Sequence, residues 1–333
     1  MKLASIERVT ELKPIEGADK ILAAKVLGFW TVVRVGEFQV GDFGVWHNPD
    51  TVADKDNPVY AFLEKSKWRI YAIRLKKQIS QGLLLPLTAF QWEAGPVEGQ
   101  DVTEKVKLTK YEAPMPEQMK SEAKGIGLPF NIPRTDEYNL LSHPYIWEEI
   151  KAKYEEIIIT IKYDGQSSTY YRKGDEKGVC SRGYDLLPNP GNGFWKANAR
   201  YSLLEKLDKT GRNLALQGEC YGPGIGGNKL GVPELSFVAF NLYDLDACAN
   251  IPSEQFLDFC ATWTIPAVPT LFIGSPKGWD LESLQQLAND TKYLNGQPAE
   301  GIVIRPYKES AICEATGRQL SGKIISESFM LST

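Results

Sequence analysis

Residues 157–168, with the sequence IIITIKYDGQSS, decide the fold of this chain. The run of β-branched residues predicts a buried strand that ends at Lys162. Asp164 and Gly165 are a turn signal, and we expect the chain to reverse there into a second strand, Ser167–Arg172. The stretch therefore predicts a sheet that presents one lysine at the mouth of its apolar interior.

Lys162 is a candidate nucleophile because a lysine at that position is partly desolvated. Desolvation lowers the pKa of an amine, and we expect a lowered pKa for Lys162. At an ordinary pKa of about 10.4, only about one amine in a thousand is neutral near pH 7.4, and only the neutral amine attacks. The alternative is a surface lysine beside a routine Asp-Gly hairpin turn, which so short a motif leaves open.

The composition is that of a globular protein with room for two domains. The 333 residues are 43% hydrophobic and 24% charged. The formal net charge is −4, so any contact with nucleic acid must come from a local basic patch. The sequence has no long apolar run, and its amino terminus is unlike a secretory signal. We therefore expect no membrane segment and a cytoplasmic location.

Cysteine and histidine usage excludes several enzyme classes. The five cysteines are scattered and include no C-x-x-C pair, which favours reduced thiols over a disulfide framework or a zinc site. The two histidines, His47 and His143, are too few and too far apart for a metal centre or a histidine-based triad.

Residues 1–105 are expected to form a small β domain. Short strands separated by turn signals favour an OB-type barrel, a fold that can bind polynucleotides. The predicted strands are residues 22–27, 30–35, 43–47, 68–75 and 82–87.

A basic segment in this domain interleaves cations with aromatic side chains. It contains Trp68, Tyr71 and the cations Lys65, Lys67, Arg69, Arg74, Lys76 and Lys77. Two interpretations stay open, namely contact with nucleic acid and a solvated strand edge protected by lysines.

The rest of the chain is expected to form a linker and a second domain. Residues 106–145 have an interrupted composition typical of a linker that packs partly on its neighbours. Residues 146–333 alternate strands and helices, and the whole chain is predicted to be an α+β protein of antiparallel sheets flanked by helices. Helices are expected at 144–150, 194–207, 253–262 and 280–289, and strands at 178–183, 214–222, 236–243, 268–273, 301–305 and 322–325.

Four charged side chains accompany Lys162. Glu219 lies inside an apolar strand, where an unpaired carboxylate would cost several kcal/mol. Glu300 precedes one apolar strand, Lys323 lies in another, and Arg182 closes an early one. Each alone is consistent with a structural ion pair. Together, a lysine nucleophile, two carboxylates for a divalent metal and two cations indicate a site that attacks the α-phosphate of a nucleotide.

These residues resemble the ordered motifs of the covalent nucleotidyltransferases, which include DNA ligases, RNA ligases and mRNA capping enzymes. Residues 162–165, Lys-Tyr-Asp-Gly, are similar to motif I, and Arg182 to the arginine after it. Residues 216–219, 237–241, 300–304 and Lys323 are similar to motifs III, IIIa, IV and V. The resemblance covers residues 155–326.

The amino-terminal region narrows the resemblance. Residues 14–19, 36–42 and 79–83 resemble the OB module of the fifth family of ATP-dependent RNA ligases. Residues 135–137, and residues 222–225 with Asn228, also resemble this family. Ten residues follow Lys323, which we expect to be too few for the carboxy-terminal OB domain of DNA ligases and capping enzymes. An RNA ligase is therefore favoured.

The resemblance implies an ATP-dependent ligase that joins RNA 3′-hydroxyl and 5′-phosphate ends, with nicks in duplexes, RNA/DNA hybrids among them, as expected substrates. Lys162 would form a lysyl-AMP and pass the AMP to the RNA 5′-phosphate. Asp164, Glu219 and Glu300 would hold Mg²⁺ or Mn²⁺, and Asp164 would also assist catalysis. A monomer is expected.

The resemblance also assigns the contacts to the nucleotide. Arg182 and Lys323 would neutralise phosphate charge, and Glu219 would contact the nucleotide together with Lys162. Phe240 would stack on adenine, although a phenylalanine in an apolar strand is equally consistent with core packing.

Two residues depart from the pattern of some relatives, and other functions remain open. Ile161 precedes the nucleophile, and Ser321 stands where some families have a second lysine. A DNA ligase, an RNA guanylyltransferase or a non-catalytic OB-fold RNA-binding protein is the alternative.

Overall fold

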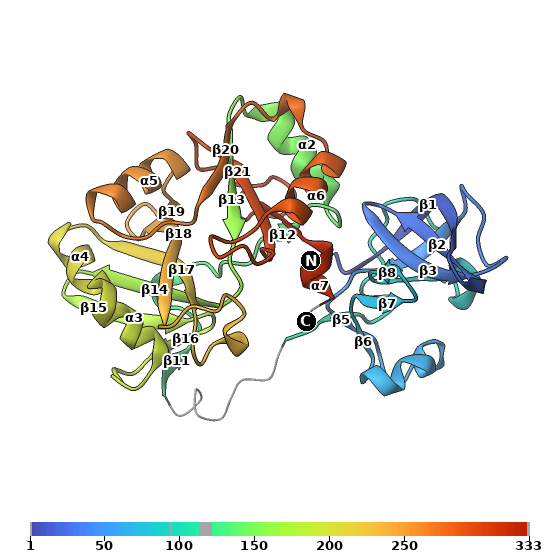
Figure 1. The fold of residues 1–333 in the computed structure, drawn as a ribbon, viewed down its shortest axis with the longest axis horizontal. Coiled ribbons are helices and arrows are strands. Elements are labelled where there is room, and N and C mark those ends of the chain that lie inside the picture. The colour runs from blue at the N-terminus through green and yellow to red at the C-terminus, as the bar shows by residue number, and fades with distance from the viewer. Residues whose placement is uncertain (1, 94, 113–121, 332–333) are drawn as a thin grey trace. The chain divides into compact units, whose positions relative to one another are not determined.

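The computed structural model describes residues 2–93, 95–112 and 122–331, and the chain forms two compact units (Figure 1). The first unit comprises Met1–Pro114 with Met330–Thr333, and the second comprises Met115–Phe329.

The first unit is built on a five-stranded antiparallel sheet with the order β3-β2-β1-β4-β9. Its strands are β1 (Ala4–Ile15), β2 (Ala18–Val26), β3 (Phe29–Arg34), β4 (Phe43–His47) and β9 (Leu83–Pro86). A three-stranded sheet joins β10 (Thr109–Lys110), β5 (Thr51–Val52) and β6 (Arg69–Ile70), and β7 (Ile73–Leu75) pairs with β8 (Gln78–Ser80).

Two predictions for this unit were wrong. The prediction omitted β1, the longest strand, because its many charged residues resemble a polar segment; Arg8 and Glu11 are exposed, whereas Ile6 and Val9 are fully buried. The single strand predicted at 68–75 is divided into β6 and β7, which belong to different sheets.

The second unit contains two sheets (Figure 1). The antiparallel seven-stranded sheet has the order β11 (Ala123–Ile126), β16 (Tyr184–Leu186), β15 (Glu176–Ser181), β14 (Gln166–Lys173), β17 (Leu214–Tyr221), β18 (Ser236–Asp244) and β19 (Ala249–Asn250). The five-stranded sheet has the order β12 (Tyr138–Asn139), β22 (Gly322–Ile325), β21 (Gly301–Pro306), β13 (Ile157–Lys162) and β20 (Thr270–Gly274). All of its pairs are antiparallel except β12 with β22.

Helices cover the apolar face of each sheet, as Figure 1 shows. Side chains of α2 (Pro144–Lys153) and α6 (Leu281–Asp290) pack with β13, β21 and β22 in one core. Side chains of α3 (Gly193–Tyr201), α4 (Leu203–Lys209) and α5 (Ser253–Thr262) pack on β14, β17 and β18 in another. The remaining helical segments are α7 (Glu327–Met330) and the 3₁₀ turns η1 (Pro58–Ser66), η2 (Leu87–Ala89), η3 (Pro129–Asn131), η4 (Gly226–Asn228) and η5 (Pro276–Gly278).

The single helix predicted at 194–207 is two helices. Ser202 separates α3 from α4 and has a φ of 52°, in the left-handed region that a continuous helix cannot contain. Both halves still bury the predicted stripe, since Ala197 and Leu207 are fully buried.

The predicted hairpin at residues 164–165 is also wrong. Strand β13 pairs with β20 and β21, whereas β14 pairs with β15 and β17, so the turn carries the chain from one sheet to the other. Gly165 is needed there for space, because a Cβ atom would lie 2.2 Å from the carbonyl oxygen of Cys220 and 2.9 Å from Cγ of Glu219.

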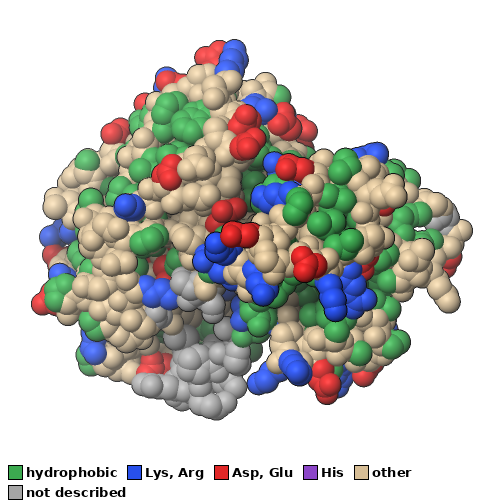
Figure 2. Space-filling model, turned by 45° about the vertical axis from the view of Figure 1, so that its right-hand side comes forward, with side chains coloured by type: hydrophobic (Ala, Val, Ile, Leu, Met, Phe, Trp, Pro, Cys, Tyr) green, Lys and Arg blue, Asp and Glu red, His purple; other side chains and the backbone are tan. Residues whose placement is uncertain are grey.

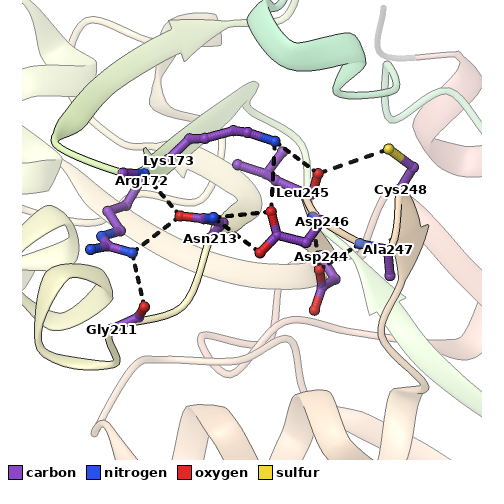
Figure 3. A network of polar contacts seen from close by, with 10 residues as sticks. Arg172, Lys173, Gly211, Asn213, Asp244, Leu245, Asp246, Ala247 and Cys248 are labelled. Carbon is purple, nitrogen blue, oxygen red and sulfur yellow. Dashed lines mark hydrogen bonds and ion pairs between the residues drawn. The ribbon is translucent and has the colours of Figure 1, made fainter.

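A polar network closes the end of the seven-stranded sheet at which β14 finishes (Figure 3). The Asn213 amide donates to both carboxylate oxygens of Asp246 at 3.0 Å, and its oxygen accepts from Arg172 at 3.1 Å. Arg172 also donates to the Gly211 carbonyl at 2.9 Å. These bonds tie the loop before β17 to β14 and to the end of β18.

Three further predictions concern the whole chain. In the part of the chain that the structure describes, no helix has the length and apolar character needed to cross a membrane. All five cysteine thiols are free. Within the predicted linker, residues 113–121 lie outside the described residues, and the remainder contributes β10, β11 and β12 to three different sheets.

His47 is a fully buried titratable group in the first unit. Its Nε2 lies 2.8 Å from the Tyr60 hydroxyl, and its Nδ1 lies 3.0 Å from the Val45 carbonyl oxygen and 3.3 Å from that of Leu83. Burial lowers the pKa of His47 from 6.5 to about 4, because the imidazolium would be desolvated. His47 is thus a neutral core residue.

We predict that this histidine makes the free energy of unfolding depend on pH. The unfolded chain binds the proton more tightly, so stability falls as the pH drops from about 6.5 towards 4, by up to about 3 kcal/mol. In His47→Gln, which cannot titrate, this component should be absent although the variant is less stable overall. Urea unfolding of the full chain at pH 7, 6 and 5 measures it, and equal pH dependence in both proteins would contradict the prediction.

Candidate active site

The register of the five-stranded sheet places three cations on one face. Val303 of β21 pairs with both Thr160 of β13 and Lys323 of β22, so these residues share a face. Lys162 and Arg305 each lie two residues further along their strands and therefore point to the same side. Ile159 and Ile161 lie on the opposite face of β13 from Lys162, and both are buried. Their apolar packing directs the lysine towards the site.

Lys162 forms an ion pair with Glu300, with 2.8 Å between Nζ and Oε2. Both side chains are largely buried, with 19% and 15% of their surfaces exposed. Burial lowers the pKa of Lys162, but the negative charges of Glu300, Glu219 and Glu137 outweigh this effect and raise it above its ordinary value.

The predicted lowering of the Lys162 pKa is therefore wrong for the protein without nucleotide. Desolvation acts in the predicted direction, but the sequence stretch around Lys162 gives no sign of the carboxylates that meet it. These carboxylates come from residues 137, 219 and 300, far away along the chain. These carboxylates favour the charged form of the amine.

The charged form of the Glu219 carboxyl is disfavoured in this site. Glu219 lies on β17 opposite Ser167 of β14. Burial raises its pKa to about 8; Lys162 opposes this rise, and Glu300, Glu137 and Asp164 add to it. A cation bound beside Glu219 would relieve this repulsion.

Lys323 is perturbed in the opposite direction from Lys162. Burial and the positive charge of Lys162 lower its pKa, while Glu137, Glu300 and Asp136 oppose the change. The structure thus brings Lys162, Lys323, Glu219 and Glu300 into one electrostatic cluster.

Asp164 and Arg182, the other predicted charged residues, have different partners. The Asp164 carboxylate lies 3.4 Å from the Lys229 ammonium. Arg182 follows β15, is half exposed and pairs with Asp136 at 2.6 Å. Asp164 acts on the cluster through its charge on Glu219, whereas no contact among the described residues joins Arg182 to Lys162.

Phe240 lies at an irregularity in β18. Gln217 pairs with Asn241 and the next residue, Gly218, pairs with Ala239, so Phe240 is a bulge residue in this ladder. Its partly buried ring packs against the apolar cluster that includes Ile161. Bulges next to active sites redirect side chains, and this one turns Phe240 towards the strand that carries Lys162.

Arg305 and Glu137 belong to the site although neither was a predicted site residue. The Arg305 guanidinium lies 2.6 Å from Glu137, and it donates to the Phe240 carbonyl at 2.6 Å and to the Ser321 hydroxyl at 3.1 Å. The sequence could have indicated Arg305 as a site residue, because it lies two residues after Val303 in the same strand and therefore on the same face of the sheet. Glu137 had a weaker signal, because it lies in a segment of little periodicity.

No feature of the sequence indicated Tyr293 as a site residue, yet its hydroxyl connects the backbone beside Lys162 to the backbone of Glu300. It accepts hydrogen bonds from the backbone N–H groups of Asp164 and Glu300, both at 3.0 Å. It donates to the Lys162 carbonyl at 3.2 Å. One hydroxyl therefore fixes the backbone on which the nucleophile and its ion-pair partner stand.

The donor chemistry of the site fits a hard divalent cation. Within the described residues, no three histidine, cysteine or acidic side chains lie close enough to form a ready-made metal site. Carboxylate oxygens nevertheless suit Mg²⁺ and Mn²⁺, which keep several water ligands. Burial, and then the nearby charges of Glu300, Glu137 and Asp164, raise the pKa of Glu219, and a cation bound there would favour its ionised form.

Comparison with known families identifies the class of protein. A model of the RNA ligase family matches residues 155–325, and an OB-fold domain model matches residues 3–87. A search of curated protein sequences found no significant match. The chain therefore belongs to the RNA ligase family.

Solved structures of a Naegleria gruberi RNA ligase are similar over nearly the whole chain. A mutant with ATP and Mn has 32% sequence identity and a TM-score of 0.81, covering 99% of this chain and 97% of that one. The protein with PPi and a mutant with AMP and Mn are also 32% identical, cover 99% and 98% of the two chains, and have TM-scores of 0.82 and 0.83. The predicted RNA ligase with an amino-terminal OB-type domain and an α+β fold is confirmed.

We predict that Tyr293→Phe slows formation of a protein–nucleotide adduct by about 10- to 100-fold, because loosening the backbone misplaces the reacting groups. Two partly buried backbone N–H groups lose their acceptor, at about 1 kcal/mol or more each. Tyr163→Phe is the control, since that hydroxyl makes no hydrogen bond within the described residues. Equal rates for both variants would contradict the assignment.

Proposed function

We propose that this chain is an ATP- and divalent-metal-dependent RNA ligase that joins 3′-hydroxyl and 5′-phosphate ends, with nicks in duplex RNA or RNA/DNA hybrids as substrates. One observation carries the proposal: Lys162 faces Glu219 and Glu300 on a sheet face that also presents Lys323 and Arg305. The ATP, AMP, PPi and Mn in the Naegleria structures support it.

We also assign a task to each part of the chain. Residues 1–105 would contact the polynucleotide, residues 106–145 would connect the domains, and residues 146–333 would transfer the nucleotide. The protein would act as a monomer in the cytoplasm.

In the first step, the Lys162 amine attacks the α-phosphorus of ATP. A nitrogen–phosphorus bond forms, the bond to the β-phosphate oxygen breaks and pyrophosphate leaves; the ammonium releases two protons to solvent, and the nitrogen of the lysyl-AMP keeps one. Glu300 orients the amine through their hydrogen bond, while Lys323 and Arg305 offset phosphate charge. Glu219, Glu300 and Asp164 would hold Mg²⁺ or Mn²⁺, whose charge would reduce the field that keeps Lys162 protonated.

In the later steps, the AMP leaves Lys162 for the RNA. An oxygen of the RNA 5′-phosphate attacks the phosphorus, the nitrogen–phosphorus bond breaks, and the amine is restored. The 3′-hydroxyl then attacks the RNA 5′-phosphorus, a phosphodiester forms, and AMP leaves. Phe240 would hold the adenine, and Arg182 would contact a phosphate.

We predict that α-labelled ATP, and neither GTP nor NAD, labels the protein covalently. Lys162→Arg should give no adduct, because a guanidinium stays protonated, while the charge opposite Glu300 is retained. Gel electrophoresis after denaturation measures the label. Labelling from GTP would favour a guanylyltransferase, and an equally labelled Lys162→Arg variant would remove the nucleophile assignment.

A panel of nicked duplexes tests the substrate. We expect sealing when the 3′-hydroxyl side is RNA and the other end carries a 5′-phosphate. A 5′-hydroxyl end should give no product, because no phosphate can accept AMP. Faster sealing of all-DNA nicks would favour a DNA ligase, and adduct formation without any sealing would contradict the proposed joining step.

A further inference from the structure

A pocket of about 460 Å³ lies in the first unit, beside the three-stranded sheet of β10, β5 and β6. It is formed by residues at the start of β5, the end of η1, β6 with the residues after it, Tyr111 after β10, and Met330 near the carboxyl end of the chain. Its charged and aromatic lining residues are Asp50, Lys65, Lys67, Arg69, Tyr71 and Tyr111. A pocket of this size suits a small ligand or one nucleotide.

The lining of this pocket has more basic than acidic side chains. Arg69 pairs with Asp50 at 3.1 Å, so the carboxylate of the lining already has a partner. Lys65 and Lys67 are exposed, and neither forms an ion pair among the described residues. The chain as a whole has a net charge of −4, and Figure 2 shows basic and acidic side chains intermixed on the visible face. The pocket is therefore a local positive site on a mixed surface.

The aromatic lining provides a flat surface beside these cations. Tyr71 is 42% exposed, and the Arg69 guanidinium lies 5.5 Å from its ring centroid. The same guanidinium lies 3.8 Å from the ring centroid of Tyr111 and covers that ring. Tyr71 thus remains available to a ligand, and nucleobases stack on such exposed rings.

The backbone at the edge of the pocket is strained. Lys67 and Trp68 are consecutive non-glycine residues with φ angles of 54° and 58°. Their N–H groups bond to the carbonyls of Glu64 and Leu63, both at 2.9 Å, so the end of η1 enforces the conformation. Residues held in such conformations cluster at binding sites, where the surroundings maintain a costly geometry.

We propose that this pocket binds one unpaired nucleotide of an RNA strand, such as one displaced from the duplex beside the nick, with its phosphate at Lys65 and Lys67 and its base against Tyr71. The inference rests on the proposed function for the identity of the polymer. Its residues are separate from those assigned to nucleotide transfer. A free nucleotide has the same chemistry, so ATP serves as a competitor in the test.

The test measures the affinity of the full chain for a fluorescein-labelled 12-nucleotide RNA with a 5′-hydroxyl and a 3′-phosphate, which cannot be ligated. Fluorescence anisotropy at several salt concentrations gives Kd and its salt dependence. Lys65→Gln combined with Lys67→Asn should weaken binding about tenfold and reduce the salt slope by about 0.7, because one phosphate loses the lysines that neutralise it. Asparagine is chosen at position 67 because it tolerates the left-handed conformation.

The aromatic contact is tested separately. Tyr71→Leu should weaken binding about tenfold, because base stacking is lost. Tyr71→Phe keeps the ring and should bind as the unchanged protein does. Equal losses in Tyr71→Leu and Tyr71→Phe would overturn the stacking role.

A matched control removes two other exposed lysines from the same unit. Lys20→Gln combined with Lys107→Asn removes the same charge; Lys107 also has a left-handed φ, of 51°, and neither residue lines the pocket. We expect Kd within about twofold of the unchanged protein, because neither lysine contacts the bound phosphate. An equal loss in this control, unchanged binding in the pocket variants, or displacement of the RNA by ATP would overturn the proposal. Failure of the ligase function would appear differently, as unchanged protein that binds RNA in the pocket but forms no adduct with ATP.

Discussion

The ion pair between Lys162 and Glu300 is the interaction on which the site depends. Its 2.8 Å contact joins the end of β13 to the residue before β21, a neighbouring strand in the same sheet. With Glu219 and Glu137, it keeps the amine charged. Only the neutral amine attacks phosphorus, so these carboxylates oppose the first step unless their charge is offset. The reaction therefore depends on a change in the charge balance, as expected for an enzyme that uses a metal and a nucleotide together.

Apolar packing determines where this chemistry takes place. Ile157 and Ile159 are fully buried beneath α2 and α6, which fixes the face and the register of β13. A slip of one residue would turn Lys162 into the core. The β17 strand is fixed in the same way, because Leu216 and Cys220 are buried on the face opposite Glu219. Each sheet thus packs one face on an apolar core and presents the charged residues of its other face to the same site.

The sequence could predict the charged cluster but not its contacts. Lys162, Glu219, Glu300 and Lys323 were identifiable because each stands at a defined position in an apolar strand or, for Glu300, directly before one. Strand pairing was not predictable from residues 164–165, because turn propensity is local whereas β13 and β14 find partners far along the chain. The direction of the Lys162 pKa shift was wrong for the same reason. Tyr293 acts through hydrogen bonds to backbone groups, which no side-chain pattern records.

The most direct test asks which of the two lysines of the site, Lys162 or Lys323, receives AMP. Lys323 has the lowered pKa expected of a free nucleophile, whereas Lys162 has a raised one but stands beside the carboxylates. The decisive measurement is peptide mapping by mass spectrometry after incubation with ATP and Mg²⁺ or Mn²⁺. We expect one AMP group on the peptide that contains Lys162. AMP on the peptide that contains Lys323, or no AMP under any of these conditions, would contradict this expectation.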